Sequence, residues 1–220
     1  INMTKRSLFA VAALSFVVSF MLPGRTVGEE SVNTWTNAGA DNNFGNGDNW
    51  SKGVPRERER GDKIVINKSG NAKAVVNKKF WTDEYWLNGT PDFRVGTKGK
   101  RGEFDINADF KYASAGSDSW AIIGADRGKG RVNHNAGIAW HGFNNLRLGL
   151  GADSYGEYNL NDGTAVIYRG SLTIGKAGSS GLMNVTGGKL KICSGVKLLS
   201  PGSTFRIGGS GAGAVHINYR

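Results

Sequence analysis

The stretch LTIGKAGSSGLMNVTGGKLKI, residues 172–192, decides the fold of this chain. It contains an apolar segment ending in Gly175, a segment in which apolar and polar residues alternate, a glycine turn and a third apolar segment. A phosphate-binding loop would need Gly-Lys followed by Ser or Thr at the start of a helix. Here Lys176 is followed by Ala177 and then by a predicted strand. The stretch is therefore interpreted as one unit of a repeat.

The pattern of an apolar residue, any residue, an apolar residue and glycine occurs in five places, at steps of 28, 25, 26 and 33 residues. Periods of about 20 to 50 residues are typical of solenoids. The five glycines that close the pattern are Gly96, Gly124, Gly149, Gly175 and Gly208.

Two further segments follow in each unit. The first opens with glycine and has apolar residues at its third and fifth positions, a period of two that predicts a strand with one buried face. An Asn, Asp and Gly turn comes next, and then a third strand. This third strand is apolar and is expected to run through Phe110/Tyr112, Ile138/Trp140, Val166/Tyr168 and Leu190/Ile192.

Three short strands in each unit predict an all-β fold, a right-handed parallel β-helix of about four to five coils. Antiparallel hairpins of a β-sandwich would not require the same apolar register in every unit. We expect the repeat to cover residues 93–220 and an aromatic N-terminal cap with the first strands to cover residues 29–92.

The N-terminus has the pattern of a secretory signal peptide, residues 1–28. Lys5 and Arg6 precede an uncharged run over residues 7–22, and cleavage is expected after Gly28. The run is shorter than the roughly 20 residues of a membrane anchor, and no later segment is long and apolar enough to span a bilayer. The sequence therefore predicts a protein that is secreted or held at the cell surface.

Charge and cysteine content exclude several functions. Loss of the signal peptide lowers the formal charge from +10 by three, to +7, which favours acidic polymers or anionic envelopes as partners. The basic residues are dispersed and no nucleic-acid-binding motif is present, so nucleic acid is not expected as a partner. Cys193 is the only cysteine, so neither an internal disulfide nor a cysteine-based zinc site is possible. No metal and no cofactor are expected.

Stacked coils place equivalent residues in columns about 4.8 Å apart. One column holds Glu103, Arg131 and Glu157. Its two carboxylates, two coils apart, have a separation suited to an inverting glycosidase, but the intervening arginine favours a neutralised ion ladder. No catalytic residue is assigned.

Asparagine fills two further columns, where stacked amides can hydrogen-bond from coil to coil. His134 takes a slot that is apolar in other coils and is expected in the core. The first column comprises Asp105, Asn133, Asn159, Asn184 and His216, and the second, at a corner, comprises Asn107, Asn135, Asn161 and Thr186.

Residues 31–90 are rich in tryptophan. These aromatic side chains are expected to cover the open end of the first coil, with stacking on a glycan as the alternative for Trp35, Trp50 and Trp86. The loop over residues 41–49 is rich in oxygen ligands, yet it departs from the calcium-loop pattern at Gly45. Turn chemistry of its Asn and Asp side chains is the preferred interpretation.

The sequence NWSKGVP, residues 49–55, is followed by GDKIVI, residues 61–66, and then by the repeats. This order resembles secreted bacterial β-helix proteins of the autotransporter-passenger type, with autotransporter-associated repeats, over most of residues 35–217. The resemblance implies a stalk or adhesive scaffold at the cell surface. The chain lacks the C-terminal barrel and sorting tail of that family and ends soon after its last repeat begins, so we expect a fragment or a coil completed by a partner.

The function expected from the sequence is a non-catalytic extracellular scaffold, structural or adhesive, of the bacterial cell surface. Its expected partner is an extracellular polysaccharide, or a second copy that pairs with the open C-terminal coil. A polysaccharide lyase or hydrolase is the enzymatic alternative, and a carbohydrate-binding module is the third. Carboxylates that converge with Arg or Lys in one groove would favour the enzyme.

Overall fold

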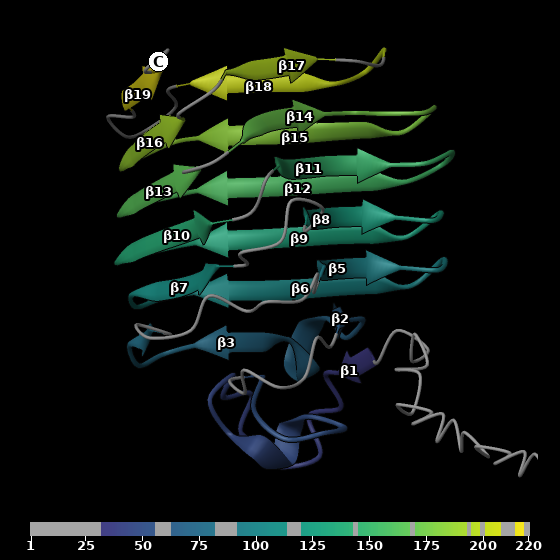
Figure 1. Ribbon diagram of the computed structural model, residues 1–220, viewed down its shortest axis with the longest axis vertical. Coiled ribbons are helices and arrows are strands. Elements are labelled where there is room, and N and C mark those ends of the chain that lie inside the picture. Colours follow the sequence, from purple (N-terminus) through teal and green to yellow (C-terminus); the bar gives the residue numbers. More distant parts are fainter. Residues whose placement is uncertain are drawn as a thin grey trace, which may run out of the picture.

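The computed structural model describes residues 32–55, 63–81, 92–113, 120–142, 145–167, 170–192, 195–198, 201–207 and 214–217 (Figure 1). The expected signal peptide, residues 1–28, and Trp86 lie outside these residues. The described chain is nearly all β and forms a rod of stacked coils, which confirms the predicted β-helix.

Three parallel sheets run along the rod. The first sheet contains β1 (Val32–Thr34), β2 (Lys63–Ile66), β5 (Phe93–Thr97), β8 (Trp120–Ala125), β11 (Asn145–Leu150), β14 (Ser171–Ile174) and β17 (Val196–Leu198). The second contains β3 (Ala74–Val76), β6 (Arg101–Ile106), β9 (Lys129–His134), β12 (Tyr155–Leu160), β15 (Ser180–Val185) and β18 (Thr204–Ile207). The third contains β4 (Phe80–Trp81), β7 (Phe110–Ala113), β10 (Ile138–Gly142), β13 (Thr164–Ile167), β16 (Lys189–Ile192) and β19 (Ala214–Ile217).

Four regular coils, β5–β7, β8–β10, β11–β13 and β14–β16, form the middle of the rod. Each strand pairs with the strand that follows one coil later, so equivalent residues stack in one register. In the second sheet this register joins the buried residues Phe104, Val132, Tyr158 and Met183. The alternating pattern of the sequence thus becomes an apolar column inside the rod and polar columns outside it.

Aromatic side chains close the N-terminal end of the core. Trp50 packs edge to face on Trp35 and on Phe44, with ring centroids 5.1 and 5.0 Å apart, and Phe44 also meets Phe80 at 4.8 Å. Two short 3₁₀ turns, η1 (Gly47–Asn49) and η2 (Gly70–Ala72), accompany this cap. The described residues contain no helix with the length and apolar character needed to cross a membrane.

The third strand of two coils has a different phase from the one expected. Phe110 stacks on Ala139, which stacks on Ala165, and His141 stacks on Ile167. Ile138 is therefore 41% exposed, and Ala139 and His141 supply the core positions of this strand in place of the expected pair Ile138/Trp140. In the next coil Ala165 and Ile167 lie in the core, and Tyr168 of the expected pair Val166/Tyr168 lies outside the described residues. The reason is the length of the corner between the second and third strands. Phe110 is three positions after Asn107, whereas its partner Ala139 is four positions after Asn135. A shift of one residue exchanges the two faces of a strand.

The last coil is also shifted relative to the sequence alignment. Phe205 pairs with Met183 in the second sheet, and His216 pairs with Lys191 in the third. Arg206, not His216, therefore continues the column of Asn184. The first-sheet strand is β17, which does not end in the repeat glycine. This coil has a strand in all three sheets, whereas an incomplete coil was expected.

Candidate functional site

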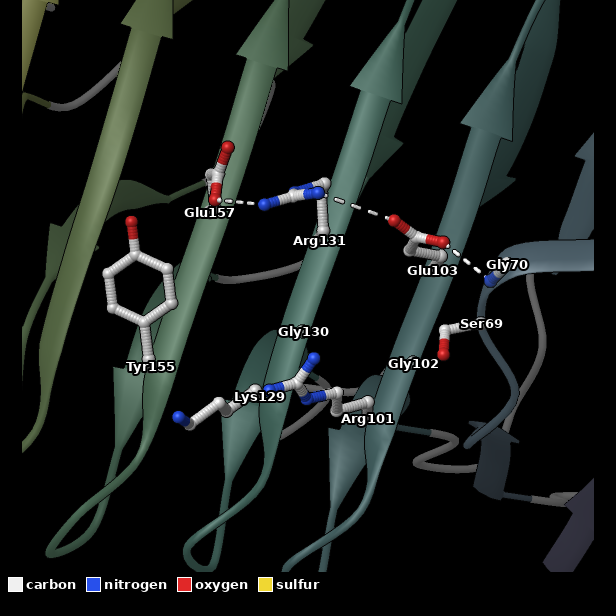
Figure 2. A pocket seen from close by; sticks show the side chains of 10 residues that line it. All are labelled: Ser69, Gly70, Arg101, Gly102, Glu103, Lys129, Gly130, Arg131, Tyr155 and Glu157. Carbon is white, nitrogen blue, oxygen red and sulfur yellow. Dashed lines mark hydrogen bonds and ion pairs between the residues drawn. The ribbon is translucent and has the colours of Figure 1, made fainter.

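The outer face of the second sheet carries a pocket of about 470 Å³ (Figure 2). Strands β6, β9 and β12 line it with two rows of side chains that run from coil to coil. Ser69 and Gly70, from the segment before β3, close one side. The two rows are Arg101, Lys129 and Tyr155, and Glu103, Arg131 and Glu157.

Arg131 lies between the two carboxylates and binds both, as the ion-ladder interpretation predicts (Figure 2). Its Nη1 is 3.4 Å from Glu103 Oε1, and its Nη2 is 3.2 Å from Glu157 Oε2. The backbone N–H of Gly70 donates to Glu103 at 2.8 Å, and Asn159 Nδ2 donates to Glu157 at 2.7 Å. Each carboxylate therefore accepts from the guanidinium and from one further N–H donor.

Arg131 and Tyr155 both keep their protons at neutral pH. Partial burial alone would lower the pKa of Arg131, but Glu157 and Glu103 outweigh it and the pKa is raised. Burial, together with the negative charge of Glu157, raises the pKa of Tyr155. Neither side chain is suited to accept a proton from a substrate.

The first row of the pocket is positively charged. Arg101 and Lys129 are exposed and are register partners on β6 and β9. In the described part of the chain, no carboxylate lies within ion-pair distance of either side chain. These two residues were not predicted from the sequence as members of a site, although both directly precede a repeat glycine, Gly102 or Gly130, and so form a column.

Amide side chains form two continuous ladders beside this pocket. At the corner, each amide donates to the one before it at 2.8 to 2.9 Å, and the ladder extends by one coil to Asn77. On the strands the corresponding distances are 2.8, 3.1 and 3.4 Å. The corner ladder comprises Asn77, Asn107, Asn135, Asn161 and Thr186, and the strand ladder comprises Asp105, Asn133, Asn159 and Asn184.

Replacement of Asn135 by alanine tests the corner ladder. This side chain donates to Asn107 and accepts from Asn161, both at 2.8 Å, so the substitution removes two hydrogen bonds. We expect the free energy of unfolding to fall by about 1 to 2 kcal/mol, since each exposed bond contributes about 1 kcal/mol or less. Urea denaturation measures the change. Lys189→Ala, at an exposed strand position, is the control, and equal stability of both variants would contradict a stabilising ladder.

The tryptophans proposed for glycan stacking are buried where the structure describes them. Trp35 is 1% exposed and donates from Nε1 to the carbonyl of Ala72, and Trp50 is 5% exposed and donates to the carbonyl of Phe44. Their ring faces pack on other aromatic rings of the cap, so the glycan assignment of Trp35 and Trp50 is wrong. Trp86 lies outside the described residues.

A polar cluster that the sequence did not reveal lies in the core. The hydroxyl of Tyr158 is 3.2 Å from His134 Nδ1 and 3.0 Å from His141 Nε2. His134 Nε2 lies 3.1 Å from the carbonyl of Gly137, so it must be the protonated nitrogen, and Nδ1 accepts from Tyr158. His141 then donates to Tyr158, and both histidines are neutral.

Burial explains the titration of this cluster. It lowers the pKa of His134, and it lowers the pKa of His141 to about 3, with a smaller effect from His134 in the same direction. Burial also raises the pKa of Tyr158. The cluster therefore stays uncharged inside an apolar core, where charging any member would be costly.

In the loop over residues 41–49, the carboxylate of Asp41 is bonded to donors of the same loop. Asp41 accepts from the backbone of Asn43 and from the side chains of Asn46 and Asn49, and these bonds lower its pKa. Across the described residues, no three His, Cys, Asp or Glu side chains are grouped to hold a metal ion.

No model of a known family matches the chain, and neither the curated proteins nor the solved structures contain a significant match. The function of the chain is therefore proposed from its own residues.

Proposed function

We propose that the chain is a non-catalytic extracellular scaffold, structural or adhesive, of the bacterial cell surface. The observation that carries this proposal is the binding of Arg131 to both Glu103 and Glu157. Carboxylates that share one arginine in this way are suited to the regular outer surface of a rod rather than to catalytic turnover. The regular coils and amide ladders support the same role, because they stiffen a long polar face.

The location at the cell surface rests on two features of the sequence. The N-terminal segment has the pattern of a secretory signal. The repeats resemble those of autotransporter-passenger proteins, in which a β-helix is a stalk or an adhesive scaffold. A rod of stacked coils (Figure 1) agrees with that kind of protein.

A polysaccharide lyase or hydrolase is the second candidate, because carboxylates do converge with Arg and Lys in one pocket. An inverting hydrolase needs one protonated carboxylic acid and one carboxylate that activates water. Arg131 opposes this division, because it forms an ion pair with Glu103 and with Glu157 and so gives the two side chains similar rather than different environments. The raised pKa of Tyr155 opposes its use as the base of a lyase.

A turnover assay separates the scaffold from the enzyme. The full chain is incubated with neutral and acidic polysaccharides, and reducing ends and the ultraviolet absorbance of unsaturated products are followed. We expect no more product than from the Glu103→Gln/Glu157→Gln variant. Product that forms with the unmodified chain and is lost in this variant would overturn the scaffold proposal.

A further inference from the structure

We propose that Arg101 and Lys129 form a subsite for the anionic group of an acidic polysaccharide, either a uronate carboxylate or a sulfate ester. This inference deepens the adhesive function and rests on it, since it names the polymer that the scaffold would hold. The subsite is the positively charged row of the pocket in Figure 2.

The first argument is the position of the two cations. Arg101 and Lys129 are register partners on neighbouring parallel strands, so their backbones are about 4.8 Å apart. Like charges placed directly opposite each other destabilise a sheet. The acids of the pocket are in the other row, where Arg131 binds them. An anion between the two cations would relieve their repulsion and accept hydrogen bonds from both.

The second argument concerns the rest of the pocket. Tyr155 continues the row of Arg101 and Lys129 at the next coil and is half-buried, so it can offer part of its ring to the face of a sugar. A carboxylate has about four acceptor sites. Glu103 uses two of these sites for the bonds described above, so acceptor sites remain on it for sugar hydroxyls.

The same features distinguish a polysaccharide from other anionic partners. A nucleic acid duplex carries one negative charge per about 1.7 Å, and the two glutamates would repel so dense a charge. A membrane surface is usually bound with the help of inserted apolar side chains, and the lining contains none apart from the ring of Tyr155. An acidic polysaccharide carries widely spaced anionic groups among its hydroxyls. This pattern matches the alternating cations, acids and amides on this face.

The test is equilibrium binding of the full chain to labelled polymers at low ionic strength. Polygalacturonate supplies carboxylates, dextran sulfate supplies sulfates, and neutral dextran supplies neither. We expect the acidic polymers to bind and the Arg101→Gln/Lys129→Gln variant to bind at least about tenfold more weakly, since hydrogen bonds to charged groups are the stronger ones. The carboxylated or sulfated polymer that loses more affinity identifies the anionic group.

The matched control is Lys189→Gln/Lys191→Gln. It removes the same charge from exposed positions of β16 on the third sheet, and we expect its affinity to change by less than about twofold. Tyr155→Phe keeps the ring and should bind as the unmodified chain does, whereas Tyr155→Ala should bind more weakly. Equal losses in the two double variants would show non-specific attraction and would overturn the subsite.

Two further outcomes would also overturn it. One is the absence of binding to either acidic polymer. The other is tighter binding to duplex DNA or to vesicles of anionic lipid than to both polymers. These failures differ from failure of the scaffold proposal, because turnover of a bound polymer would contradict the scaffold while leaving the anion subsite intact.

Discussion

Replacement of Gly156 by alanine is expected to prevent the chain from folding, or to lower its free energy of unfolding by at least about 4 kcal/mol. A Cβ atom at this position of β12 would lie 1.9 Å from the carbonyl oxygen of Ile123 and 2.5 Å from the backbone nitrogen of Gly149. Both neighbours are backbone atoms of the first sheet, so no side chain can move aside. The effect is steric, because Gly156 does not have a positive φ.

Gly45→Ala is the matched control. Its Cβ would meet only Asn43 Oδ1, at 3.5 Å, and its φ is not positive, so we expect a change within about 1 kcal/mol. Circular dichroism and urea denaturation of both variants measure the difference. Equal denaturation midpoints would show that the two sheets do not approach as closely as described.

Acidification is expected to destabilise the protein through its buried histidines. The pKa of His141 is about 3 in the folded state and 6.5 as its ordinary value. Between these pH values the unfolded chain binds the proton and the folded chain does not, so stability falls as the pH drops below 6.5. At pH 4 this residue alone should lower the free energy of unfolding by about 3 kcal/mol. His134 acts in the same direction.

His141→Ile isolates this contribution. Isoleucine fills the same column at positions 167 and 192, and the hydroxyl of Tyr158 can still donate to His134. Urea denaturation at pH 7 and pH 4 should show that the variant retains about 3 kcal/mol more of its neutral stability than the unmodified chain does. The same acid loss in both proteins would contradict a neutral, buried His141.

The second sheet could be predicted from the sequence because its signals are local. In the four regular coils glycine is the second residue of this strand, and the apolar side chains that follow, such as Tyr158 and Leu160, alternate with polar ones. The ion ladder and the amide columns could be predicted from that alternation, because parallel coils in one register stack equivalent positions on each other. His134 was placed inward for the same reason, and it is fully buried.

The third sheet could not be predicted in the same way. Its phase depends on the length of the corner, which changes by one residue, and Ala139 and Ala165 give little hydrophobic contrast with their neighbours. His141 therefore could not be recognised as a core residue, although it contacts Tyr158. The side of the pocket formed by Ser69 and Gly70 was missed because these residues precede the repeat.

Because the four regular coils share one register, the length of the rod and the charge of its pocket depend on different features of the sequence. Insertion of one more unit would lengthen the rod by about 4.8 Å while leaving every column continuous. The positive row of the pocket depends instead on single positions in two coils, Arg101 and Lys129. Duplication of units can thus change the length of the rod, and point substitutions within one column can change the charge of the pocket on its outer face.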